Sequence, residues 1–240
     1  ELAGSEVKSQ VAMIYDWDSR WAMEDSKGPR NDGLHHQEML LKYYRAFRKQ
    51  GMNVDLIDMD CSIEGYQVLV LPMTYMFKQG FAEKVRAFVE QGGVLITTYW
   101  SGIADDTDRC YLGGTPHGLM DVLGLRSTEI DGLFDWEENQ FMPVDGNELG
   151  LFREYTCKYL CDLVRLDGAQ ALMTYGSDFY QGYPALTVNR YGKGSAWYVA
   201  ADAEQVFQED FIAKLLEHEE ICGAVPGEIP EGLEGTTRET

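Results

Sequence analysis

The chain lacks any long apolar run: none of its 240 residues lies in a stretch of the roughly 18 to 20 apolar residues that a membrane-spanning helix requires. The sequence therefore excludes a membrane-spanning helix. Basic residues are also scarce, with 20 lysines and arginines against 40 aspartates and glutamates, which gives a net charge of -20. Because such a chain repels a phosphate backbone, binding to nucleic acid is not expected.

Paired cysteines are missing as well. The five cysteines are odd in number, irregularly spaced and without a CxxC pair, which suits a reducing cytoplasm: Cys61, Cys110, Cys157, Cys161 and Cys222. A zinc site at Cys157 and Cys161 would need two further ligands at suitable spacing, so we predict no metal. What is present is apolar material, at 45% of the residues with only 7 prolines, enough for one sizeable core.

The first 125 residues alternate between short apolar runs and helical patterns. Near-continuous apolar runs predict parallel strands covered on both faces, at Val11–Tyr15, Val54–Met59, Val68–Met73 and Val94–Tyr99. Between them, apolar residues at helical spacing run from Met39 to Phe47 and from Phe81 to Val89, and glycines at 51 and 92 predict left-handed helix ends. This order predicts an α/β fold with an open, mostly parallel, doubly wound sheet.

After Leu125 the pattern changes to period-two alternation punctuated by turns. It predicts strands at Leu160–Leu166, Ala171–Tyr175, Ala185–Arg190 and Ser195–Ala200, with a hairpin turn at Tyr191–Gly194. A last helix is expected at about 204–220. The polar stretch 129–150 is expected to be a surface excursion. Together these features predict one α/β domain with an antiparallel β extension.

Aromatic and charged residues follow the predicted parallel strands, at the rim where open α/β sheets present their loops. Met73 and Phe77 lie there too. The candidates for a subunit interface or a pocket rim are Asp16, Trp17, Trp21, Glu24, Tyr75, Trp100, Asp105, Asp108 and Arg109. The alternative for each aromatic residue is packing inside its own domain.

Other polar groupings favour structural interpretations. His35 and His36 are adjacent at a helix start, where side chains point about 100° apart and do not share an ion easily. The acidic stretch 105–108 lacks the calcium-loop pattern, and Gly113 and Gly114 form no phosphate-binding fingerprint. We predict no cofactor.

Several blocks in order resemble one protein family. They are VAMIY followed by DWDSRWAMEDSKGPRND and HHQEMLLKYYRAF, then YQVLVLPMTYM, then FVEQGGVLITTYWSGIADDTDRCYLGGTPHGLMDVLGL, and finally GSDFYQGYPALTVNRYGKGSAWYVA. This sequence resembles the trimerisation domain, the middle domain, of glycoside hydrolase family 42 β-galactosidases. The resemblance implies a flavodoxin-like fold similar to class I glutamine amidotransferases.

The resemblance also implies a division of labour. In the family the catalytic glutamates belong to a preceding barrel that this chain lacks, so no catalytic residue is carried over. The implied partners are two further copies, forming a homotrimer, and the missing barrel, with a β-galactoside reached only through the parent enzyme. The chain begins without methionine, and the expected boundaries are a linker at 1–10, the trimerisation domain at 11–223 and the start of a truncated C-terminal β-domain at 224–240.

A second interpretation remains open: a free-standing amidotransferase-like or small-ligand-binding protein that uses the same rim loops. Amidotransferases place a nucleophilic cysteine on a tight turn after a central strand. Here the turn after VLITTYW carries Ser101 and Gly102, there is no cysteine between Cys61 and Cys110, and no GxSxG motif is present. A covalent nucleophile at this turn therefore has little support.

Overall fold

Five parallel strands form the centre of the structure. The computed structural model describes residues 3–30, 33–223, 233, 235–236 and 238–239. The parallel strands adjoin in the order β3 (Val54–Ile57), β2 (Val11–Ile14), β4 (Val68–Leu71), β6 (Val94–Thr98) and β13 (Gly194–Val199). The first strand in sequence therefore lies between the second and the third, which is the flavodoxin-like order. Every residue of β2, β4 and β6 is buried, which confirms three of the predicted parallel strands and their coverage on both faces. β3 is also parallel as predicted, but it lies at the edge of the sheet and is only partly buried. β13, buried throughout, was expected in the antiparallel extension and instead pairs in parallel with β6.

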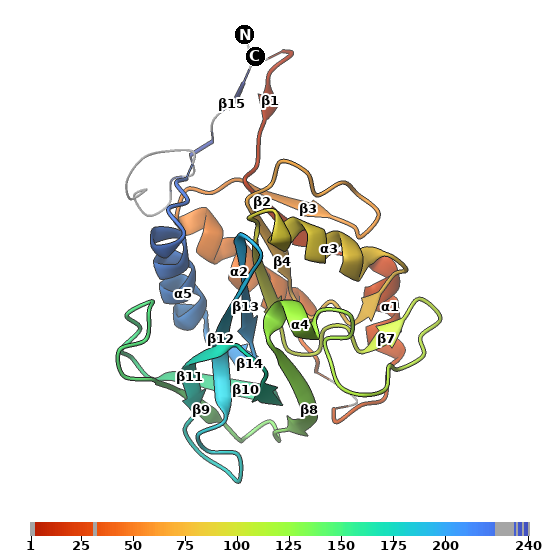
Figure 1. Ribbon diagram of the computed structural model, residues 1–240, viewed down its shortest axis with the longest axis vertical. Helices are drawn as coiled ribbons and strands as arrows, with labels where there is room; N and C mark the ends of the chain where they lie inside the picture. The colour runs from red at the N-terminus through yellow and green to blue at the C-terminus, as the bar shows by residue number, and fades with distance from the viewer. Residues whose placement is uncertain (1–2, 31–32, 224–232, 234, 237, 240) are drawn as a thin grey trace.

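Helices cover both faces of this sheet (Figure 1). α2 (His36–Lys49) and α5 (Gln205–His218) contact each other on one face, and α3 (Phe81–Glu90) and α4 (Met120–Leu123) pack on β13 from the other. The apolar stripe of α2 is buried as its spacing predicts, through Met39, Leu40, Tyr43, Ala46 and Phe47. None of the described helices combines the length and apolar content that crossing a bilayer requires.

An antiparallel extension continues the sheet beyond β13. Its strands are β12 (Pro184–Tyr191), β11 (Gln170–Tyr175), β9 (Asn139–Pro143), β10 (Tyr155–Leu166) and β14 (Ala201–Ala203), with β8 (Leu125–Gly132) also paired to β10. The predicted hairpin between β12 and β13 is confirmed, because Tyr191 pairs with Gly194. One mixed sheet thus runs through the domain, as the sequence predicted.

Two parts of the sequence interpretation were wrong or incomplete. The stretch 129–150 is not only a surface excursion, because β8 extends to Gly132 and β9 begins at Asn139. The segment after β2 forms a helix, α1 (Trp17–Asp25), that the apolar pattern did not predict. The carboxylate of Asp16 starts this helix by accepting hydrogen bonds from the backbone N–H groups of Asp18 and Ser19, at 3.0 and 3.1 Å.

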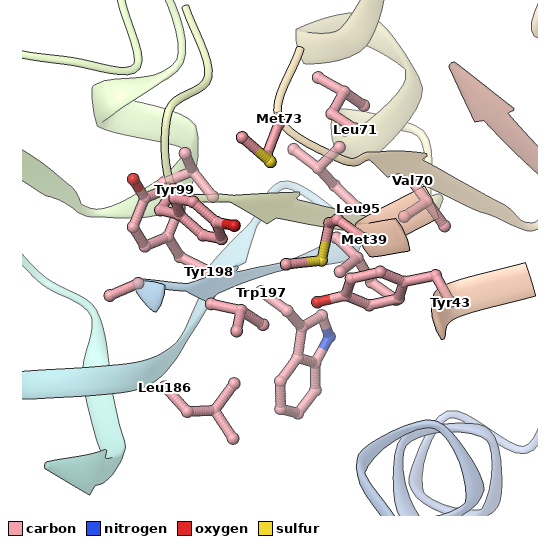
Figure 2. Close-up of a cluster of buried hydrophobic side chains, with 14 of the residues drawn as sticks. Met39, Tyr43, Val70, Leu71, Met73, Leu95, Tyr99, Leu186, Trp197 and Tyr198 are labelled. Atoms are coloured by element: carbon pink, nitrogen blue, oxygen red, sulfur yellow. The ribbon is translucent and has the colours of Figure 1, made fainter. Parts of the chain in front are cut away.

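The core lies where the parallel and antiparallel parts of the sheet meet. Figure 2 shows the ring of Tyr43 from α2, Leu95 from β6 and Trp197 from β13 gathered in one buried cluster. Trp197 is fully buried, and its indole N–H donates to the hydroxyl of Ser195 at 2.9 Å. This cluster joins both halves of the sheet to the helices.

The two ends of the described chain lie together at the amino ends of the parallel strands. β1 (Glu6–Val7) pairs with β15 (Arg238–Glu239), and the Arg238 guanidinium donates to the backbone oxygen of Ser5 at 3.1 Å. Figure 1 shows this ribbon beyond the start of β2, at the amino ends of the parallel strands. The expected C-terminal β-domain start at 224–240 lies largely outside the described residues, and the boundaries of the linker and of that segment stay predictions.

Candidate functional site

The loops at the carboxyl ends of β2, β4 and β6 are tied together. β5 (Met76–Phe77) follows β4 and pairs in parallel with β7 (Ala104–Asp105), which follows β6. The backbone N–H of Met76 donates to the Ser19 hydroxyl of α1 at 3.1 Å. We call this surface the rim; its three loops form one connected structure and not three independent tips.

Lys78 is the electrostatic centre of the rim. Its ammonium lies 2.9 Å from a carboxylate oxygen of Asp16, 3.0 Å from Asp18 and 3.1 Å from Asp60. The Asp16 side chain is only 1% exposed, so its charge is compensated by Lys78 and by the helix-capping N–H groups and not by water. Burial alone would lower the pKa of Lys78, but the hydrogen bonds that its ammonium donates to these carboxylates stabilise the charged form and raise the pKa overall.

Two of the candidate tryptophans are open to solvent. Trp17 is 53% exposed and Trp21 is 58% exposed, and their ring centroids lie 5.9 Å apart. The Arg20 guanidinium lies over the Trp17 ring at 5.2 Å and donates to Glu24 at 2.8 Å. The first turns of α1 therefore present an aromatic surface with a fixed cation beside it, the composition that concentrates at binding hot spots.

Two other candidate aromatics are buried instead. Trp100 is 4% exposed and packs against Tyr75, which is equally buried, at a centroid distance of 5.7 Å. The segment that covers Trp100 contains Gly28, where a Cβ would lie 2.5 Å from the indole ring. Trp100 and Tyr75 thus support the rim from beneath, and only glycine lets the covering segment lie so close.

The loop that holds Asp105, Asp108 and Arg109 is organised by one carboxylate. Asp105 accepts hydrogen bonds from the backbone N–H and hydroxyl of Thr107, at 2.9 and 2.6 Å, and from the guanidinium of Arg109 at 3.1 Å. The Thr107 hydrogen bond contributes most to holding the pKa of Asp105 at about 2. The side chain of Arg109 remains exposed, so it is available to a partner.

A cavity of about 450 Å³ opens between these loops, beside the exposed Trp21 ring. Its lining combines four carboxylates with one ammonium and three apolar side chains, from Asp18, Trp21, Ala22, Asp25, Met76, Lys78, Asp106 and Asp108. The structure therefore brings Trp21, Asp18 and Asp108 together at the rim, while Glu24 lies on the neighbouring face of α1 with Arg20. Sequence reasoning missed Lys78, because its partners lie in two other segments of the chain, Asp16 and Asp18 at the start of α1 and Asp60 after β3.

The residues of the turn after β6 are buried inside the domain. Trp100 takes the left-handed conformation there, with φ 58°, at the position where a hydrolase elbow would hold its nucleophile. Ser101, which follows it, is buried, and its hydroxyl accepts from the backbone N–H of Thr74 at 3.1 Å. This arrangement gives no support to a covalent nucleophile at the turn.

The two adjacent histidines point to different neighbours. His35 stacks on Tyr159 at 4.3 Å, whereas His36 stacks on Tyr15 at 5.7 Å. Burial lowers the pKa of His36 to about 4, so its imidazole is neutral near pH 7. Within the described residues, no group of three or more His, Cys, Asp and Glu side chains is placed to hold a metal ion.

With the fold and rim in view, comparison with known proteins identifies the family. A family model described as the β-galactosidase trimerisation domain matches residues 9–222. The chain belongs to this family. The match covers both the parallel sheet and its antiparallel extension, and it confirms the resemblance found in the sequence.

Individual relatives agree over nearly the whole chain. The chain is 44% identical to β-galactosidase BglY of Alicyclobacillus acidocaldarius over 237 residues, which is 99% of this chain and 34% of BglY. The solved structure of a β-galactosidase from Rahnella sp. R3 superposes with a TM-score of 0.95 at 47% identity, covering 99% of this chain and 35% of that one. The β-galactosidase from Bacillus circulans sp. alkalophilus gives a TM-score of 0.93 at 36% identity, covering 100% and 35%. The chain thus spans about a third of the length of the curated relatives it matches.

Proposed function

We propose that this chain assembles three copies of a β-galactosidase and supplies no catalytic carboxylate itself. The family membership over residues 9–222 carries this proposal. The parent enzyme, its β-galactoside substrate and its catalytic barrel are part of the proposal, because the relatives are about three times as long as this chain. The five unpaired cysteines support the cytoplasm, a reducing compartment, as the place where the protein functions.

The geometry of the two ends of the sheet supports an intersubunit role for the rim. The β1–β15 ribbon leaves from the amino ends of the parallel strands, whereas Trp17 and Trp21 lie at the carboxyl ends. We propose that a neighbouring copy covers the exposed tryptophans and that the rim helps to wall the sugar pocket of that neighbour.

The first test is the solution mass of this chain by light scattering over a concentration series. We expect a mass near three times 27.2 kDa, because a closed ring of three uses all contact surfaces of each copy. A monomer at every concentration would contradict self-association by this chain. A ligand screen against the rim cavity would then test the small-ligand-binding alternative.

Replacing Trp21 by alanine in the proposed full-length enzyme tests the rim directly. We expect the trimer to dissociate, or KM to rise, by about tenfold or more, because an exposed tryptophan at an interface centre is a typical hot spot. Arg109→Ala should act in the same direction. Phe152→Ala serves as the control, since Phe152 is also exposed but follows β9, away from the rim. Unchanged mass and unchanged kinetics in the Trp21 variant would remove the rim from the interface.

A further inference from the structure

A second exposed aromatic surface lies on the turn between β8 and β9. We call residues Phe134–Glu138 the aromatic turn. Phe134 is 61% exposed and Trp136 is 78% exposed, and their rings stack at a centroid distance of 4.8 Å with an interplanar angle of 3°. Two stacked aromatic rings facing water are costly for a chain that works alone, so a partner that covers them would gain from their burial.

The aromatic turn is held in one conformation. The backbone N–H of Glu137 donates to the Phe134 carbonyl, and the Glu137 carboxylate accepts from the Phe134 N–H, both at 2.9 Å. The Arg30 guanidinium binds the Leu133 carbonyl and, at 2.5 Å, the Asp135 carboxylate. A turn fixed at both ends loses little conformational entropy on binding, which favours a role in recognition.

Two arginines that repel each other face one another at the opposite end of β8, one on β8 and one on the neighbouring strand β10. We call Arg126 and Arg165 the arginine pair; they stand directly opposite on β8 and β10, and both are exposed. Neither has a carboxylate partner within the described part of the chain. Like charges directly opposite on neighbouring strands destabilise a sheet, and an anionic partner would relieve that repulsion.

We propose that the aromatic turn of one copy docks on the arginine pair of the next copy. The charges are complementary, although two of the three carboxylates on the turn already pair within the chain, Asp135 with Arg30 and Glu138 with Lys158 at 2.6 Å. Glu137, whose carboxylate binds only the Phe134 N–H among the described residues, leaves the turn with a net negative charge beside the two rings. Arginine also stacks on the face of a tryptophan ring while it pairs with carboxylates. This inference rests on the proposed trimer and specifies which surfaces of the domain meet in it.

Symmetry and distance both require the contact to be between copies. The aromatic turn and the arginine pair lie at opposite ends of β8, about 25 Å apart at the usual rise per residue, so they do not meet within one chain. A ring of three is built from contacts between unlike surfaces, and each copy here carries one surface of each kind.

Light scattering on variants of the 240-residue chain tests the contact. Arg126→Glu with Arg165→Glu, and separately Phe134→Ser with Trp136→Ser, should each weaken the trimer by at least about tenfold. Arg45→Glu with Lys193→Glu makes the same charge change at exposed residues elsewhere and should leave the mass unchanged. Circular dichroism checks that each variant is folded.

Mixing the two interface variants gives the sharper result. The chain with both arginines replaced keeps its aromatic turn, and the chain with both aromatic residues replaced keeps its arginine pair. One copy of each can therefore form a single intact contact. The mixture should therefore stop at a dimer, whereas each variant alone stays monomeric. A mixture that forms trimers, or one that stays monomeric, would overturn the inference.

The mass of the wild-type chain distinguishes failure of the proposed contact from failure of the proposed assembly function. A wild-type trimer together with trimeric double variants overturns the contact and leaves the assembly function in place. A wild-type monomer contradicts the assembly function and the contact with it. A single Arg126→Gln change adds a readout in dilute monomer: the Tm should rise by about 1 to 3 °C as the repulsion is removed, while the trimer becomes weaker. An equal or lower monomer Tm would contradict the repulsion on which the inference rests.

Discussion

Lys78→Met is expected to lower the Tm of the domain by about 5 to 10 °C. Methionine keeps the length of the side chain but removes the ammonium that three carboxylates share. The Asp16 carboxylate, 1% exposed, would then be a buried charge with only backbone N–H donors, those of Asp18, Ser19 and Met59, which costs on the order of 2–3 kcal/mol. Thermal unfolding followed by circular dichroism near pH 7 measures the effect.

Two matched changes show whether the effect belongs to the buried charge. Lys193→Met removes an exposed lysine from the turn between β12 and β13 and should shift the Tm by less than about 2 °C. Asp60→Asn removes the most exposed of the three carboxylates and should also have a small effect, because water screens that ion pair. If Lys78→Met unfolds at the same temperature as Lys193→Met, Lys78 does not stabilise the rim.

The parallel half of the fold could be predicted from the sequence because its signal is local. Strands covered on both faces are apolar at nearly every position, so VAMI, VLVL and VLITT stand out without any tertiary information. The strands β8 and β9 were hidden for the opposite reason. In β8, LRSTEIDG, only the first and third residues are fully buried, so a stretch rich in polar residues looked like a loop.

The candidate site was predicted less well than the fold, and two tryptophans show why. Trp21 and Trp100 are the same residue type at the same rim, yet one is 58% exposed and the other 4%. The difference comes from the segment around Gly28, which folds over Trp100 from another part of the chain. No local pattern around either tryptophan carries that information.

Lys78 illustrates the same limit for charges. Its partners come from the start of α1 and from the connection between β3 and β4, so the cluster forms only when three loops meet. In a sequence with 40 acidic residues, no spacing rule selects these three. The family resemblance predicted the rim as a location, and the structure was needed to show which residues hold it together.

A buried carboxyl makes the second large prediction. Asp162 in β10 is fully buried; the Tyr198 hydroxyl donates to one of its oxygens, and the other has no hydrogen-bond partner among the described residues. Burial raises the pKa of Asp162 to about 7, from 3.8 in an exposed carboxyl. The folded protein therefore keeps a proton on Asp162 over a pH range in which the unfolded chain releases it.

The sign of the pH dependence follows from proton binding. Between the two pKa values the folded state binds more protons, so stability falls as pH rises through this window and levels off above about pH 7. The shift corresponds to a loss of about 4 kcal/mol across the window. Asp162→Asn, which retains an acceptor for Tyr198, should remove this contribution to the dependence of stability on pH.

The measurement compares Tm at about pH 4.5 and about pH 8 in wild type and variant. The wild-type Tm should fall by roughly 10 °C more than that of Asp162→Asn, because only the wild type must bury a charge at the higher pH. Asp145→Asn, at an exposed position in the turn after β9, should keep the full wild-type dependence. Parallel pH profiles for wild type and Asp162→Asn would show that Asp162 is already ionised in the folded protein at the lower pH.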